Sequence, residues 1–110
     1  MAQYSPLDEV FAALADPTRR RVIAELGRGP ASVGELARSA SMTLPSFMKH
    51  VRTLERCGLI RTAKSGRVRT CTIDRERLAV IDDWLGEQRA IWEDRTDRLE
   101  RFLTDTEEQT

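Results

Sequence analysis

The chain has 110 residues, of which 40% are hydrophobic and 33% charged, and its formal net charge is zero. This length suits one domain, or one half of a dimer that shares its core with a second copy. No apolar run approaches the roughly 20 residues of a membrane span. The first residues lack the basic and apolar regions of a signal peptide. Two cysteines are too few for a disulfide scaffold, so we expect a cytoplasmic protein with no membrane partner.

The neutral total hides two oppositely charged halves. Residues 1–74 contain 12 Lys and Arg against 7 Asp and Glu, a net charge of +5, whereas residues 75–110 contain 6 against 11, a net charge of −5. A basic half suits a polyanion such as nucleic acid, and an acidic half suits solvent or a protein partner. Accidental clustering is the alternative.

The first predicted helix begins after Ser5-Pro6, a capping residue followed by proline at the first helical position, and ends near Ala15. Its apolar stripe comprises Leu7, Val10, Phe11 and Leu14.

Asp16-Pro17 repeats the start signal and opens a second helix that ends at Gly27 or Gly29. Three arginines, Arg19 to Arg21, stand in its first turns, where the helix dipole is positive and does not favour cations. We therefore expect an external anion or an acidic neighbour as their partner, a solvated face being the alternative.

Ser32 and Glu35 fit a capping box that opens a short third helix ending at about Ala40. After a tight link, a fourth helix is expected from the Thr43 cap to a glycine stop at Gly58. Two short helices joined in this way predict a helix-turn-helix.

The fourth helix has two different faces. Phe47, Val51 and Leu54 recur at helical spacing and lead into the apolar pair Leu59-Ile60. The opposite face carries Lys49, Arg52 and Arg56. One apolar and one bare basic face have the form of a DNA recognition helix. An amphipathic core helix with a solvated face is the alternative.

Beyond Gly58 the pattern changes to that of strands. Residues 59–64 and 68–73 predict a hairpin around a Ser65-Gly66 turn. Its tip presents three cations, Lys64, Arg67 and Arg69. A basic ribbon directly after such a helix predicts a wing.

A short turn capped by Asp74 and running through Leu78 is expected next, and then a long helix from about Ile81 to Leu103. Its apolar positions recur every three or four residues and form a stripe too wide for one small domain to bury. We expect a dimer interface here and on the first helix, formed by Leu7, Phe11, Trp84, Ile91, Trp92, Leu99 and Phe102. Folding of this helix back onto its own subunit is the alternative.

The expected organisation is thus a single domain over residues 1–110. It has a DNA-binding core at residues 5–79, a dimerisation helix at residues 81–103 and a frayed tail at residues 104–110. The fold class is mainly α with a small β-hairpin.

Three segments in order resemble the ArsR family of winged helix-turn-helix transcriptional regulators: LADPTRRRVIAEL at residues 14–26, SVGELA at 32–37, and LPSFMKHVRTLERCGLIRTAKSGRVRTCTID at 44–74. The resemblance covers roughly residues 7 to 103. It implies a homodimeric repressor of a pseudo-palindromic operator, its own promoter included, that blocks access of the polymerase.

Within this family the metal-sensing members place cysteines around the positions of residues 33–37, or paired histidines and acids on the last helix. This chain has neither, and its one histidine, His50, lies seven residues before Cys57, roughly 10.5 Å along a helix and too far for one zinc ion. We expect no metal and no cofactor, and a packing or hydrogen-bonding role for His50. Cys57 and Cys71 are expected to be small buried residues, with a thiol-responsive switch as the alternative.

The candidate base-reading residues occupy the first turns of the fourth helix, and they are Thr43, Leu44, Ser46, Met48 and Lys49. The candidate phosphate-binding residues are Arg52, Lys64, Arg67 and Arg69. A winged-helix module that binds protein in place of DNA is the competing class. No catalytic constellation stands out, and the sequence names no small-molecule inducer.

Overall fold

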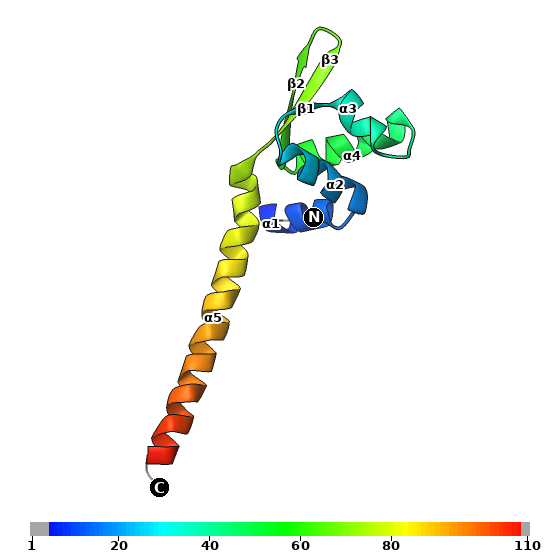
Figure 1. The fold of residues 1–110 in the computed structure, drawn as a ribbon. Coiled ribbons are helices and arrows are strands. Elements are labelled where there is room, and N and C mark those ends of the chain that lie inside the picture. The colour runs from blue at the N-terminus through cyan, green and yellow to red at the C-terminus, as the bar shows by residue number, and fades with distance from the viewer. Residues whose placement is uncertain (1–4, 109–110) are drawn as a thin grey trace. The chain divides into compact units, whose positions relative to one another are not determined.

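The computed structural model describes residues 5–108 and divides the chain into two units, residues 1–80 and 81–110. The elements follow one another along the chain as coloured in Figure 1: α1 (Pro6–Leu14), α2 (Pro17–Leu26), β1 (Ala31–Ser32), α3 (Val33–Arg38), α4 (Leu44–Arg56), β2 (Ile60–Ser65), β3 (Val68–Ile73) and α5 (Arg75–Glu108). The fold is mostly helical with one small antiparallel sheet, as expected for a winged helix-turn-helix.

Local capping sets the starts of the first four helices. The side chains of Ser5, Asp16, Ser32 and Thr43 each accept a hydrogen bond from the backbone N–H three residues ahead, at 3.0 to 3.4 Å. Each bond satisfies one of the amide groups that lack a partner at a helix start. All four predicted caps are confirmed.

The core of the first unit lies between α4, the sheet and the other short helices. Phe47, Val51 and Leu54 on α4 are at most 1% exposed, and Leu59 and Ile60 continue this buried row into β2. Burial of each such side chain stabilises the fold by about 1.5–3 kcal/mol relative to exposure. The predicted apolar row is confirmed, and its burial fixes which face of α4 points outward.

A glycine turn joins α4 to the sheet. Gly58 has a φ of 85°, its N–H donates to the Glu55 carbonyl, and the Leu59 N–H donates to the Leu54 carbonyl, both at 3.0 Å. This is the Schellman arrangement, which glycine adopts without the steric cost a Cβ would bring. It confirms the predicted stop.

The sheet has the order β1-β3-β2, with both pairs antiparallel. Ser65 pairs with Val68, so the hairpin loop is Gly66-Arg67, one residue later than predicted, and the left-handed φ of Gly66 (63°) makes the tight turn possible. The third strand was not predicted. It is only two residues long and pairs Ala31 with Cys71, so it shows no periodicity in the sequence.

The predicted short turn before the long helix is wrong. Asp74 caps α5 directly, because its Oδ1 accepts from the N–H groups of Glu76 (3.0 Å) and Arg77 (3.3 Å). The predicted end of the long helix at Leu103 is also wrong, since α5 continues to Glu108, and the fraying predicted for residues 104–110 stays a prediction. Thr106 donates to the Phe102 carbonyl one turn back, at 2.8 Å. The last two residues of that predicted tail lie outside the described range.

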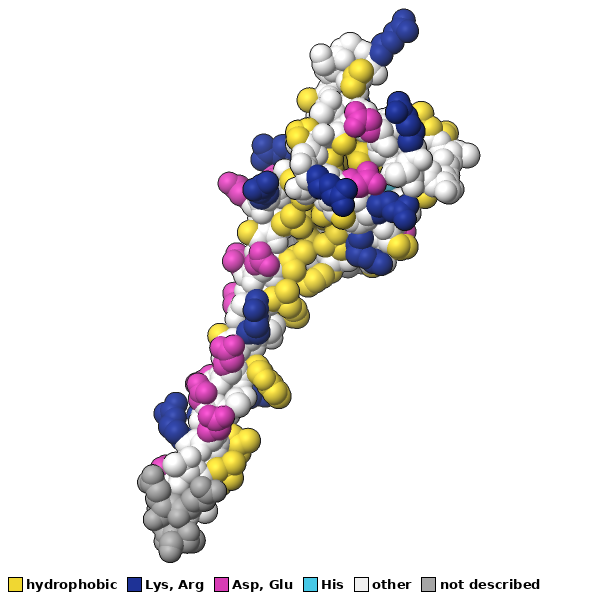
Figure 2. All heavy atoms as spheres, viewed as in Figure 1, with side chains coloured by type: hydrophobic (Ala, Val, Ile, Leu, Met, Phe, Trp, Pro, Cys, Tyr) yellow, Lys and Arg dark blue, Asp and Glu magenta, His cyan; other side chains and the backbone are white. Residues whose placement is uncertain are grey.

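The second unit consists of α5 from residue 81 onward. Apolar side chains gather along one side of this helix, and acids and arginines follow the other, as Figure 2 shows. Ile91, Trp92, Leu99 and Phe102 are 53–71% exposed. Within residues 5–108, no helix is long and apolar enough to cross a membrane.

Candidate nucleic-acid interface

The outward face of α4 carries the predicted base-reading residues. Thr43, Leu44, Ser46 and Lys49 are exposed, Leu44 by 55%, and Met48 is half-buried. Apolar and polar groups thus stand together on the first turns of this helix. Such a mixture suits the floor of a major groove, where thymine methyl groups alternate with hydrogen-bonding base edges.

The wing and α3 meet this helix around an open hollow of about 430 Å³. Leu44 and Met48 form its α4 side, and Arg67, Val68 and Arg69 form its wing side. In the sequence, these residues are related only because the hairpin follows the fourth helix along the chain. The fold brings them to one surface.

Arg38, at the end of α3, lines the same hollow and is exposed. Sequence reasoning missed it, because one arginine in a short helix has no distinguishing spacing. Only the packing of α3 beside β3 brings its charge to the surface formed by α4 and the wing.

A second hollow, of about 310 Å³, shares Met48 and Arg69 with the first. Its remaining lining residues are Val51, Arg52, Glu55 and Thr62. Together the two hollows are lined by four arginines and one acidic residue. This imbalance favours a polyanion.

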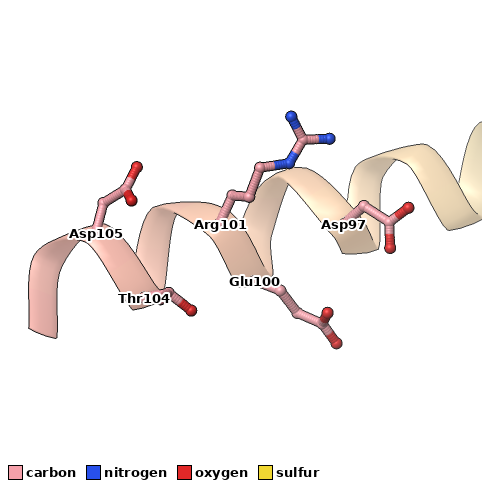
Figure 3. A pocket seen from close by; sticks show the side chains of 5 residues that line it. All are labelled: Asp97, Glu100, Arg101, Thr104 and Asp105. Carbon is pink, nitrogen blue, oxygen red and sulfur yellow. The ribbon is translucent and has the colours of Figure 1, made fainter. Parts of the chain in front are cut away.

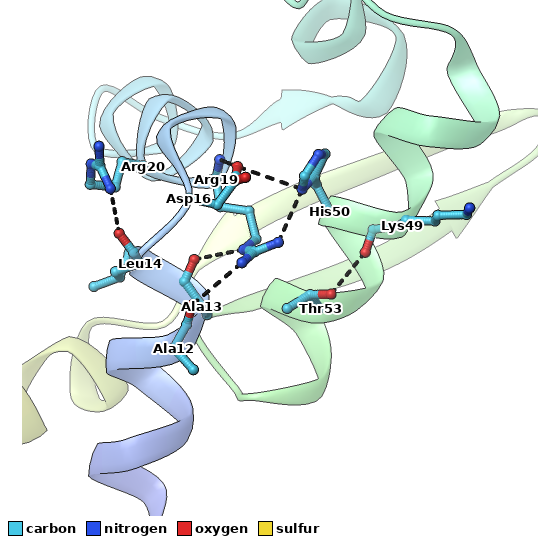
Figure 4. Close-up of polar contacts among 9 residues, drawn as sticks. All are labelled: Ala12, Ala13, Leu14, Asp16, Arg19, Arg20, Lys49, His50 and Thr53. Carbon is cyan, nitrogen blue, oxygen red and sulfur yellow. Dashed lines mark hydrogen bonds and ion pairs between the residues drawn. The ribbon is translucent and has the colours of Figure 1, made fainter.

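Behind this surface, Arg19 joins three elements of the fold (Figure 4). Its Nε donates to the Ala13 carbonyl at 2.6 Å and its Nη2 to the Ala12 carbonyl at 3.3 Å, and its Nη1 lies 3.1 Å from His50 Nδ1 on α4. The arginine side chain therefore ties the last turn of α1 to the outward-facing helix.

The neighbouring arginines behave alike. Arg20 donates to the Leu14 carbonyl and Arg21 to the Ser39 carbonyl, both at 2.8 Å. Neither side chain forms an ion pair within residues 5–108, so the prediction of an acidic neighbour is wrong for both, whereas an external anion as partner stays a prediction. Their partners are carbonyl groups at helix ends, which have no partner within their own helices.

His50 takes part in hydrogen bonding, as predicted, because its Nδ1 faces both Arg19 and, at 3.7 Å, the carboxylate of Asp16. Burial by itself raises the pKa of Asp16, but the N–H of Arg19 and the nearby side chains of His50 and Arg19 outweigh it and lower that pKa. Asp16 thus stays ionised while it caps α2.

Both cysteines are buried and free, and no three His, Cys, Asp or Glu residues of the described chain gather as a metal site would require. Burial, and then the charge of Glu55, raise the pKa of the Cys71 thiol, although Arg69 opposes this. A raised pKa reduces the thiolate fraction that reacts with oxidants. These environments favour a packing role over a thiol switch.

A shallow hollow on α5 is of a different kind. Figure 3 shows that its five lining side chains, three of them acidic, stand on successive turns of a single helix. With no wall from a second element and an excess of negative charge, it does not suit nucleic acid.

The comparisons with known proteins agree with this geometry. A family model described as a helix-turn-helix domain matches residues 14–63. The transcriptional regulator Rv2034 of Mycobacterium tuberculosis is 35% identical over 81 residues, which are 74% of this chain and 76% of that protein. The transcriptional repressor SdpR of Bacillus subtilis is 30% identical over 61 residues, 56% of this chain and 68% of that protein.

Solved structures extend the likeness to the fold. A crystal structure of an ArsR family transcriptional regulator is 55% identical, with a TM-score of 0.79, and the match covers 81% of this chain and 98% of that one. An ArsR-like regulator from Rhodococcus sp. RHA1 is 31% identical, with a TM-score of 0.75 and coverage of 88% and 92%. The chain therefore belongs to the ArsR family of winged helix-turn-helix transcriptional regulators, and it is a DNA-binding regulator of that type.

Proposed function

We propose that the protein is a homodimeric repressor that recognises a pseudo-palindromic operator, its own promoter included. The observation that carries the proposal is the division of α4: its apolar row is fully buried, while Leu44 and Lys49 are exposed and Met48 lines the hollow beside the basic wing. A helix fixed on one side and exposed on the other is suited to enter a major groove.

Two residue groups have different roles in this proposal. Thr43, Leu44, Ser46, Met48 and Lys49 read base edges, with Lys49 suited to guanine and the apolar side chains to thymine methyl groups. Arg52, Lys64, Arg67 and Arg69 hold phosphates and set the position of the helix on the duplex.

The apolar face of α5 supports the dimer. Trp92 is 71% exposed and Phe102 67% exposed within the single chain, and large apolar faces of this kind mark protein interfaces. A helix of 34 residues is about 51 Å long, enough to pair extensively with a second copy. A dimer would present two recognition helices roughly 34 Å apart, one turn of the duplex.

The proposed repressor action is supported by SdpR, a relative described as a transcriptional repressor. We further propose that the protein does not sense metals through the two sites named above for the family. Residues 33–37 contain no cysteine, and His50 is the single histidine of the sequence.

Fluorescence anisotropy with the DNA upstream of the gene, and with a scrambled duplex of equal length, tests this proposal. Replacing Met48 and Lys49 together by alanine should cost about 1–3 kcal/mol per lost base contact on the upstream duplex and much less on the scrambled one. Arg67→Ala should weaken binding to both duplexes. It should also reduce the slope of log K against log salt by about 0.9 per lost phosphate contact.

Equal affinity of the wild-type protein for both duplexes would refute sequence-specific recognition. A protein that binds other proteins in place of DNA would bind neither duplex.

A further inference from the structure

Arg69 lies on the side of the wing that continues the protein core. In the β2–β3 register Thr62 stands opposite Cys71, and Lys64 stands opposite Arg69. Residues two apart on a strand share a face, so Arg69 is on the same face as buried Cys71. This places the arginine beside α4, where it lines the hollow with Met48.

A chain of hydrogen bonds holds the arginine there. Arg69 Nη1 donates to Thr62 Oγ1 at 2.9 Å, and the Thr62 hydroxyl in turn donates to the Glu55 carboxylate. A threonine hydroxyl has a single proton. Because that proton points to Glu55, a lone pair of the same oxygen is turned toward Arg69.

The other two cations at the wing tip are not held in this way. Within residues 5–108, the side chains of Lys64 and Arg67 have no hydrogen bond or ion pair, and both are exposed. A mobile side chain loses conformational freedom when it binds, whereas a held one has already lost it. Among the three cations at the wing tip, Arg69 is thus the one that is oriented before DNA arrives.

Glu55 is otherwise difficult to account for. It is the one acidic residue among those that line the two hollows, and a carboxylate on this surface repels phosphate. Its contact with Thr62 gives a physical reason for its presence.

We propose that Thr62 and Glu55 are positioning residues that orient the Arg69 guanidinium for its contact with DNA. The inference rests on the proposed function, in which Arg69 holds a phosphate. It predicts that removal of the Glu55 negative charge weakens DNA binding. Charge repulsion alone would predict stronger binding.

The test measures DNA affinity of full-length Glu55→Ala and Thr62→Val, each in the wild type and in an Arg69→Ala background. In the wild type both changes should weaken binding by about two- to tenfold per subunit, the range expected for loss of one ordered side chain. In the Arg69→Ala background Thr62→Val should have no effect, because there is no guanidinium left to orient. Glu55→Ala should tighten DNA binding in this background, because the only remaining effect of the carboxylate is to repel phosphate.

Thr62→Ser keeps the hydroxyl and should restore wild-type affinity, which a general packing defect of Thr62→Val would not predict. Thr62→Val should also leave the salt slope unchanged, since it removes no charge. Circular dichroism and thermal unfolding confirm that each variant is folded.

Tighter or unchanged binding by Glu55→Ala in the wild type would overturn the proposal, and so would equal effects of Thr62→Val with and without Arg69. The scrambled duplex separates this outcome from failure of the proposed function. A wild type that binds both duplexes equally refutes operator recognition, yet the sign of the Glu55→Ala effect can still be read on either duplex.

Discussion

The link that Arg19 makes between α1 and α4 should be a major source of stability in the first unit. Replacing Arg19 by alanine removes three contacts of its guanidinium group, two to main-chain carbonyls of α1 and one to His50. A hydrogen bond from a charged group contributes about 1.5–3 kcal/mol when buried and less when water can replace it. Two of the three contacts are partly buried and one is exposed, so we expect Arg19→Ala to lower the free energy of unfolding by about 2–3 kcal/mol.

Arg20→Ala is the matched control. Arg20 is adjacent on α2 and also donates to an α1 carbonyl, but through one exposed bond, so its loss should cost under about 1 kcal/mol. Urea unfolding followed by circular dichroism measures the loss of unfolding free energy in both variants. All samples are kept at one protein concentration, because the stability of the proposed dimer would depend on concentration. Arg19→Lys should recover only part of the loss, since an ammonium lacks the planar fork.

A cost of Arg19→Ala within about 0.5 kcal/mol of the Arg20→Ala cost would refute this reasoning. It would mean that water replaces the guanidinium at the end of α1 and that the contact with His50 does not hold α4.

Three further changes test other parts of the structure. Gly58→Ala should destabilise the fold by about 1–2 kcal/mol because alanine is strained at a φ of 85°. Gly34→Ala, in a helix where the added Cβ would make only an ordinary contact with Ser32, should not, and equal unfolding free energies for the two variants would contradict the Schellman assignment. The N–H of Arg77 and then the Arg61 guanidinium lower the pKa of Asp74. The ionised carboxylate therefore stabilises the fold fully above the usual pKa of an aspartate, and this stabilisation is lost as the pH falls through the lowered pKa. Asp74→Asn should therefore reduce the melting temperature at neutral pH, with a difference that narrows in acid; a difference constant from pH 7 to pH 2 would be inconsistent with this. Trp92→Glu, at a 71% exposed position, should convert the proposed dimer to a folded monomer in analytical ultracentrifugation, and a dimer that persists would place the interface elsewhere.

Much of the proposed nucleic-acid interface could be predicted from the sequence because it depends on local patterns. The Thr43 cap, the buried row from Phe47 to Leu54 and the Gly58 stop lie within one short segment, and each is set by interactions among near neighbours. A helix whose inner face is fixed in this way has its outer face fixed as well. The sequence was therefore sufficient to bring Met48 and Lys49 to the surface.

The same local reasoning failed where partners come from distant segments. Carbonyl groups at the ends of α1 and α3 accept hydrogen bonds from Arg19, Arg20 and Arg21. No residue spacing in the sequence predicts such contacts. Arg38 joins the basic surface only because α3 packs beside β3.

The sequence by itself determined the helix starts, the buried face of α4 and the basic hairpin, because capping, helical periodicity and strand alternation act over a few residues. Only the tertiary structure decided that Ala31-Ser32 adds a strand to the sheet and that Glu55, Thr62 and Arg69 form one chain. Those contacts depend on the register and packing of separate elements. A hydrogen bond between two elements exists only once both have been brought to the same place.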